Sequence, residues 1–157
     1  MSEPGRNAED TKARRGLGGS PELNRLTEQI IGAAMRVHSA LGPGLLESAY
    51  EACLARELEI SGHAAIRQKR LPIVYRDLKL DEGYRIDLPV DNRVIVELKA
   101  IESILPVHEA QLLSSLRLAS CEVGLLINFH VRHLREGIRR VINTRSTVEP
   151  PVPPVSP

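Results

Sequence analysis

Asp87, Glu97 and Lys99 lie close together in a stretch where apolar and polar residues alternate, and their types and spacing suggest a chemical site. The alternation predicts two neighbouring strands, residues 84–90 and 94–99. Because side chains two residues apart share one face of a strand, Glu97 and Lys99 are expected on the same face. Paired carboxylates are ligands that Mg²⁺ and Mn²⁺ prefer, and a neighbouring ammonium can orient water or stabilise an anion.

The apolar residues of the two strands fix their register. Matching the apolar faces sets Asp87 directly opposite Glu97 and requires an odd connection, Asp91-Asn92-Arg93, or a bulge with the same effect. A two-residue turn would instead place the two carboxylates on opposite faces of the sheet. The other pairs expected in this register are Val90 with Val94, Leu88 with Val96, Ile86 with Leu98, and Arg85 with Lys99.

Two interpretations of this hairpin are open. Like charges directly opposite one another destabilise a sheet, and a divalent cation between Asp87 and Glu97 would remove that cost. Alternatively, the same residues form a surface ladder of ion pairs, Asp87 with Lys99 and Glu97 with Arg85. The spacing of an acid and a lysine does not by itself decide between them.

The elements around the hairpin predict an α/β or α+β domain with a mixed central sheet and helices on its faces. Ser20 is a good N-cap for a helix that begins at Pro21, and Gly42-Pro43-Gly44 separates it from a second helix. The second helix is expected to bury Leu46 and Cys53 on one face. The expected order is ααββββαβα, with helices at about 21–41, 46–60, 106–118 and 134–142 and strands at about 71–75, 78–80, 84–90, 94–99 and 123–129.

The length of 157 residues fits one domain with tails. Residues 21–145 are expected to fold, residues 1–20 to form a disordered leader, and residues 146–157 a Pro-rich extended tail. No apolar run is long enough for a membrane helix and no secretory signal is present, so we expect a cytoplasmic protein. Cys53 and Cys121 are expected to be buried free thiols.

The net charge of +1 does not indicate nucleic-acid binding, but the distribution of charge leaves it open. Lys and Arg gather in two clusters, which would contact phosphates or simply form solvated faces. The clusters are Arg67, Lys69, Arg70, Arg76 and Lys79, and Arg132, Arg135, Arg139, Arg140 and Arg145.

Five ordered motifs resemble those of the GxxExxY protein family, a compact branch of the PD-(D/E)xK nuclease superfamily. The likeness runs from about Leu23 to Asn143 and implies a restriction-endonuclease-like core. The motifs are Gly44-Leu-Leu-Glu47-Ser-Ala-Tyr50, Tyr84-Arg-Ile-Asp87, Val96-Glu97-Leu-Lys99-Ala, His108-Glu-Ala-Gln111-Leu-Leu and Gly124-Leu-Leu-Ile-Asn128-Phe.

The resemblance also implies roles for individual residues. Asp87 and Glu97 would bind the metal together with the Leu98 backbone carbonyl, and Glu47 would be an additional acid beside it. Lys99 and Gln111 would complete the catalytic set. Two positions depart from the pattern: Ile86 stands where the superfamily name has Pro, and Ser115 stands where an aromatic is expected. Tyr50 would hold the Glu47 carboxylate or pack in the core, and core packing is favoured.

The function implied is Mg²⁺- or Mn²⁺-dependent hydrolysis of a nucleic-acid phosphodiester, with DNA as the expected substrate. Arg85, His108, Arg139 and Arg140 are expected to contact that substrate. The alternative is a non-catalytic module that binds nucleic acid or protein on the same fold. A homodimer or a partner protein would help a domain of this size to hold its substrate.

Overall fold

The structure, a computed structural model, describes residues 19–144. The predicted leader and Pro-rich tail therefore fall almost entirely outside the described residues. The elements are α2 (Pro21–Leu41), α3 (Glu47–Ile60), β1 (Lys69–Tyr75), β2 (Leu78–Ile86), β3 (Leu88–Val90), β4 (Val94–Lys99), α4 (Pro106–Ala119), β5 (Val123–Asn128), the short 3₁₀ helix η1 (Leu134–Gly137) and β6 (Ile138–Ile142).

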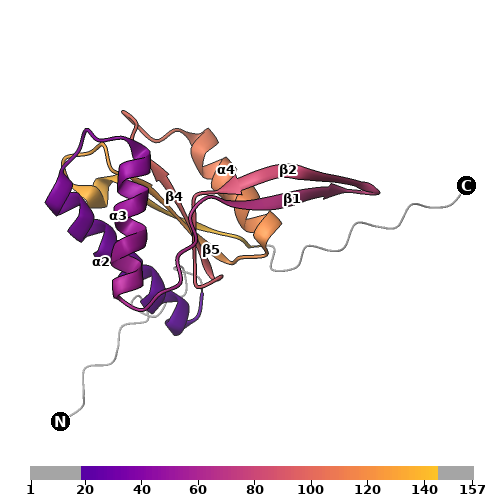
Figure 1. The fold of residues 1–157 in the computed structure, drawn as a ribbon, viewed down its shortest axis with the longest axis horizontal. Helices are drawn as coiled ribbons and strands as arrows, with labels where there is room; N and C mark the ends of the chain where they lie inside the picture. Colours follow the sequence, from indigo (N-terminus) through magenta and orange to yellow (C-terminus); the bar gives the residue numbers. More distant parts are fainter. Residues whose placement is uncertain (1–18, 145–157) are drawn as a thin grey trace, which may run out of the picture.

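A mixed four-stranded sheet forms the centre of the domain (Figure 1), and it confirms the predicted fold class. Its strands lie in the order β3-β4-β5-β6, and the β4–β5 pair is parallel while the other two pairs are antiparallel. A parallel pair needs a crossover connection, and α4 supplies it between β4 and β5. β5 is buried along its whole length, as its unbroken apolar run predicts.

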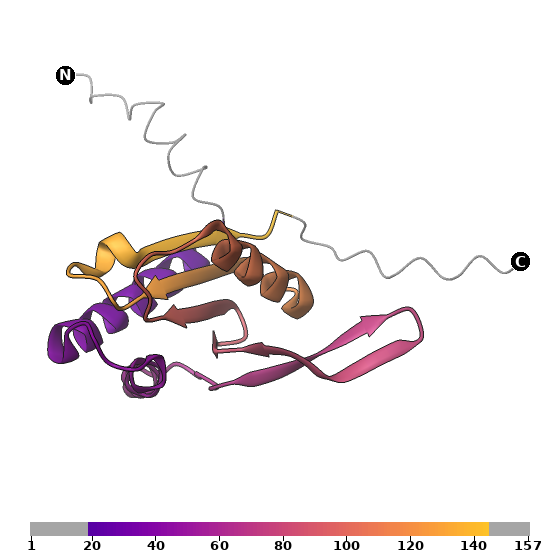
Figure 2. The ribbon, with the colours of Figure 1, turned by 90° about the horizontal axis from the view of Figure 1, so that it is seen from above.

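The two faces of the sheet pack against different helices (Figure 2). Val94, Val96 and Leu98 of β4 belong to the apolar core formed with α2 and α3. Ile95 points the other way and packs with Leu112 of α4. This alternation places Glu97 and Lys99 on the α4 face of the sheet.

The register predicted for the hairpin is confirmed where β3 pairs with β4. Leu88 lies opposite Val96, and the three-residue connection Asp91-Asn92-Arg93 joins the strands. Asp91 and Asn92 both adopt φ values of +52°, which Asp and Asn tolerate better than most residues.

The pairing of Ile86 with Leu98 is wrong. The chain bends at Asp87, so Ile86 ends β2, pairs with Lys69 of β1 and packs on the α4 side of the sheet. One predicted strand is thus two: residues 84–86 extend β2, and β3 begins after the bend. β1 and β2 form a separate two-stranded ribbon that extends away from the domain body in both views (Figures 1 and 2).

The predicted last helix is also wrong, because residues 138–142 form strand β6. Ile138 pairs with Ile127 and Val141 with Gly124. The backbone of this segment thus forms hydrogen bonds with the edge of β5 that β4 leaves unpaired. Apolar residues at these positions fit either a helix or an alternating strand, and β-branched side chains favour the strand. Pairing with a distant strand decides between them.

The connection between α2 and α3 is held by Tyr50. Its ring is fully buried and stacks on Phe129 at a centroid distance of 4.5 Å. Its hydroxyl donates to the Gly42 carbonyl and accepts from the Leu45 backbone N–H at 3.1 Å. Core packing of Tyr50 is confirmed, and its hydroxyl fixes the loop that leads into Glu47.

Three further expectations concern burial and membranes. Leu46 is 78% exposed, contrary to prediction, because it caps α3 and its side chain lies outside the helical face. Both cysteines are free; Cys121 is buried as predicted, whereas Cys53 is only half-buried. Within residues 19–144, no helix combines the length and apolar character needed to cross a membrane.

Replacing the Tyr50 hydroxyl tests its role in the α2–α3 connection. We expect Tyr50→Phe to lower the free energy of unfolding by about 1–2 kcal/mol, because two backbone groups lose a part-buried partner. Urea denaturation measures the change. Tyr75→Phe, at an exposed ring, is the matched control; equal stability of the two variants would contradict the role.

Candidate active site

Six of the residues predicted for the site meet at one cavity of about 350 Å³ on the α4 side of the sheet. They come from the end of β2, the bend after it, β4 and the first half of α4. The lining residues are Gly83, Tyr84, Arg85, Asp87, Glu97, Lys99, His108, Gln111 and Leu112.

Asp87 occupies the bend between β2 and β3, where its side chain takes over hydrogen bonding that a continuous strand would provide. Its Oδ2 accepts from the Leu98 backbone N–H at 3.0 Å. Its Oδ1 accepts from the side-chain amide of Gln68 at 3.2 Å. These two donors orient the carboxylate toward β4 and keep it beside Glu97.

Glu97 is half-buried next to Asp87, and its Oε1 is buried without a hydrogen-bond partner among the described residues. The pKa of Glu97 is raised to about 8, first by burial and then by the negative charge of Asp87, while Lys99 acts in the opposite direction. A hydrogen bond from protonated Glu97 to Asp87 adds to this rise in pKa. Without a cation, Glu97 therefore keeps its proton near neutral pH.

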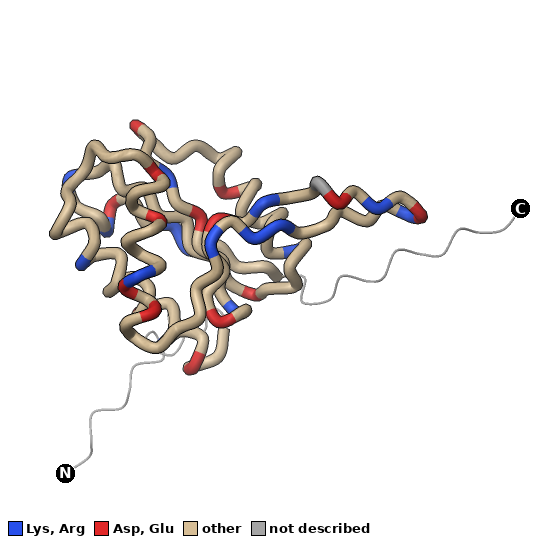
Figure 3. Tube along the Cα trace, in the orientation of Figure 1, with Lys and Arg blue, Asp and Glu red and all other residues tan. Residues whose placement is uncertain are grey.

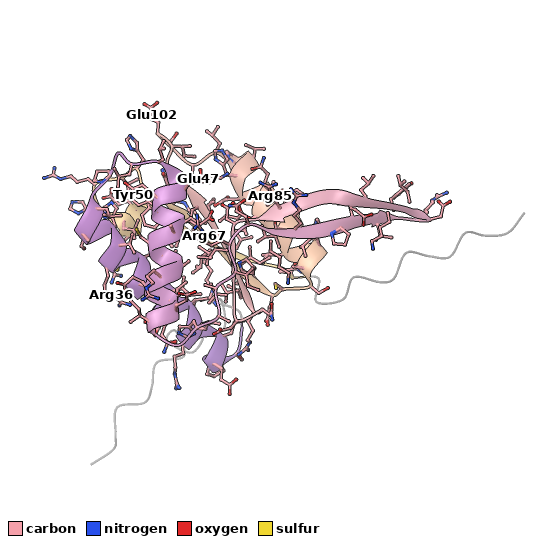
Figure 4. All side chains as sticks on the ribbon, viewed as in Figure 1. Arg36, Glu47, Tyr50, Arg67, Arg85 and Glu102 are labelled. Atoms are coloured by element: carbon pink, nitrogen blue, oxygen red, sulfur yellow. The ribbon has the colours of Figure 1, made fainter. Side chains whose placement is uncertain are left out.

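Glu47 approaches the same carboxylates from the first turn of α3. It does not line the cavity, but burial raises its pKa, and the charge of Asp87 raises it further while Lys99 lowers it. Figure 4 shows Glu47 and Arg85 on the same side of the domain, whereas Arg36 lies toward the other end of α3. The structure thus brings Glu47 near the site from the opposite helix layer.

The first half of α4 supplies His108 and Gln111 to the cavity. The Gln111 backbone carbonyl accepts from the Tyr84 hydroxyl at 3.2 Å and from Ser115 Oγ at 3.1 Å, which ties α4 to the ribbon. His108 Nδ1 accepts from the Leu105 backbone N–H at 2.9 Å. Neutral His108 then carries its proton on Nε2, which makes it a hydrogen-bond donor to the cavity rather than a base.

Two residues behind the site, Glu51 and Gln68, were not predicted. Glu51 is only 3% exposed, and its carboxylate accepts from Arg67 at 3.0 Å and from the Gln68 amide at 2.6 Å. Gln68 also donates its backbone N–H to the Asp87 carbonyl at 2.8 Å, and its φ of +53° is left-handed. The buried Glu51 carboxylate on α3 thereby positions the Gln68 side chain, which in turn donates to Asp87.

Arg139 and Arg140 do not line the cavity. Arg140 crosses to the other face of the sheet, where it donates to Asn24 at 2.6 Å and to Thr27 at 3.3 Å on α2. Arg139 donates to the backbone carbonyls of Glu136 and Ile138. Because the last element is a strand, it sends these neighbouring arginines to opposite faces of the sheet.

The side chains at the cavity provide only part of the ligand set of a divalent cation. Within residues 19–144, no three His, Cys, Asp or Glu side chains are arranged as a complete ligand set. Asp87 and Glu97 nevertheless offer hard oxygen ligands. Glu97 Oε1, which has no hydrogen-bond partner among these residues, is an oxygen that a cation would coordinate. Two carboxylates suit Mg²⁺, which keeps several waters in its coordination shell.

Comparison with known proteins adds one finding. A family model described as the PD-(D/E)XK nuclease superfamily matches residues 24–141, about three quarters of the chain. No match was found among curated proteins or among solved structures.

The raised pKa of Glu97 predicts how stability depends on pH in the absence of divalent cations. The folded protein binds a proton that the unfolded chain releases at lower pH, so stability falls as the pH rises from about 5 to about 8. The slope should approach about 1.4 kcal/mol per pH unit, the value for one proton. Chemical denaturation across this range in EDTA measures it.

Glu97→Gln is the comparison variant for this pH dependence, because it keeps the shape and removes the titration. Its stability should change less with pH, and it should exceed that of the wild type at the alkaline end. Parallel curves for the two proteins would contradict a raised pKa at Glu97.

The position of Gln68 predicts an indirect effect on cation binding. Gln68→Asn keeps an amide and a residue type that tolerates left-handed φ, but it is too short to bridge Glu51 and Asp87. We expect its affinity for Mn²⁺ to fall about tenfold or more, as is usual for residues that orient ligands. Calorimetry well below the unfolding temperature measures this, with exposed Gln29→Asn on α2 as control; unchanged affinity in Gln68→Asn would refute the role.

Proposed function

Because the chain belongs to the PD-(D/E)XK nuclease superfamily, we propose that it hydrolyses nucleic-acid phosphodiester bonds with Mg²⁺ or Mn²⁺ at the Asp87–Glu97 cavity. The observation that carries the proposal is the Glu97 Oε1 atom, a buried carboxylate oxygen without a partner in the described part of the chain, held beside a second carboxylate and Lys99. We also propose, from its five motifs, that the chain is a member of the GxxExxY branch.

The charged residues in and beside the cavity have roles that follow from their positions. Asp87 and Glu97 would hold the cation, with the Leu98 carbonyl between them in sequence and Glu47 near them in space. The cation supplies Lewis-acid polarisation of the phosphate and a water of lowered pKa. Lys99 shares the face and the cavity with Glu97, so its ammonium orients the attacking water or stabilises the charge that develops on the phosphate.

The rim of the cavity offers donors rather than bases, which suits an anionic substrate. Arg85, Gln111 and the Nε2–H of His108 face the same space as the two carboxylates. Arg85 supplies a charged donor for a phosphate oxygen. Gln111 positions the substrate or Lys99.

Lys99→Ala and Asp87→Asn test this proposal. We expect each to lower the rate of Mg²⁺- or Mn²⁺-dependent DNA cleavage at least about 100-fold, because each removes a group that acts at the developing charge. A fluorescent DNA panel with single- and double-stranded substrates measures the rate, and circular dichroism checks the fold.

The matched control is Glu102→Gln, which removes an exposed carboxylate that does not line the cavity. Figure 4 shows Glu102 at the edge of the domain, away from Glu47 and Arg85. Full activity in Lys99→Ala and Asp87→Asn would refute the assignment. Absence of both cleavage and Mn²⁺ binding in the folded wild type would favour the non-catalytic binding module.

A further inference from the structure

Two arginines lie directly opposite each other where the β1–β2 ribbon leaves the domain. Arg70 pairs with Arg85 in the antiparallel register, and both are exposed. No described side chain forms an ion pair or a hydrogen bond with either guanidinium. Like charges in this arrangement destabilise a ribbon unless an anion lies between them.

The charge of the ribbon differs from that of the rest of the chain. Residues 67–86 contain six Lys and Arg and three Asp and Glu. The rest of the chain contains fifteen Lys and Arg and seventeen Asp and Glu. Figure 3 shows the basic positions gathered at the base of the ribbon, next to the acidic positions of the domain body. The excess of positive charge therefore lies at the base of the ribbon, whereas residues 76–82 near its turn hold two basic and three acidic residues.

The ribbon is also continuous with the cavity. Gly83, Tyr84 and Arg85 of β2 form part of the cavity wall, and from there the ribbon runs outward to the turn at Arg76. Its shorter strand, β1, has seven residues and spans about 24 Å, the length of about seven base-pair steps. Near the turn, the exposed apolar residues are Val74, Tyr75, Leu78 and Leu80.

We propose that the β1–β2 ribbon is an arm that enters the major groove of duplex DNA, with Arg70 and Arg85 holding a backbone phosphate beside the one in the cavity. This rests on the proposed function and names its substrate as double-stranded. The major groove of B-form DNA admits a two-stranded ribbon, whereas that of A-form RNA is too narrow and deep. The apolar tip suits thymine methyl groups, and two tyrosines offer little stacking for single strands.

Arg70→Glu separates a phosphate contact from a structural role. It places opposite charges across the strands, so the thermal stability of the variant should equal or exceed that of the wild type. Its affinity for a duplex of about 20 base pairs should fall about tenfold or more, and the salt dependence of binding should weaken by about one phosphate contact or more. Fluorescence anisotropy in EDTA, where cleavage is absent, measures both.

The matched control is Arg25→Glu, the same charge change at an exposed position in the first turns of α2. It should bind the duplex within about twofold of the wild type. The wild type should also bind the duplex more tightly than a single strand of the same length. No duplex binding by the wild type, equal losses in Arg70→Glu and Arg25→Glu, or a preference for the single strand would each overturn the proposal.

The outcomes for the arm and for catalysis are distinguishable, because binding in EDTA requires no cleavage. Duplex binding and cleavage are thus two separate measurements, so failure of the nuclease assay leaves the binding result interpretable. The alternative partner for the exposed apolar residues near the turn of the ribbon is a second copy of this chain. If mass measurement shows a dimer that Tyr75→Ser dissociates, while Arg70→Glu binds DNA normally, the arm joins two copies and the proposal is wrong.

Discussion

The close approach of the Asp87 and Glu97 carboxylates is the interaction on which the rest of the site depends. Burial and mutual repulsion make it unfavourable, and the pKa of Glu97, raised to about 8, expresses that cost. The fold maintains it with hydrogen bonds to Asp87 from the Leu98 backbone and from Gln68. A divalent cation that replaces the proton on Glu97 would remove this cost.

The bend at Asp87 links the cavity to the ribbon. Because the chain turns there, β3 joins the central sheet and β2 leaves it, and Asp87 accepts from β4 instead of continuing a strand. Helix α4 closes one side of the cavity through Gln111, and α3 brings Glu47 from the other layer. The buried parallel pair β4–β5 supplies the rigid base on which these contacts depend.

The sequence predicted the residues of the cavity better than the path of the chain. Apolar alternation was sufficient for the register of β3 and β4, since a slip of one residue would expose a buried face. It failed at Ile86 because a bend reverses the alternation, and at residues 138–142 because pairing with β5 outweighs local periodicity. Glu51 and Gln68 gave no local signal, because their contact joins a helix to a distant loop.

A crystal of the full chain grown with Mn²⁺ would test the central claim most directly, since anomalous scattering locates the ion without reference to activity. The account predicts an anomalous peak within bonding distance of both Asp87 and Glu97, about 2.2 Å from their nearest oxygens. It also predicts that the peak is lost in Glu97→Gln. A peak elsewhere, or none in crystals in which the two carboxylates remain side by side, would contradict it.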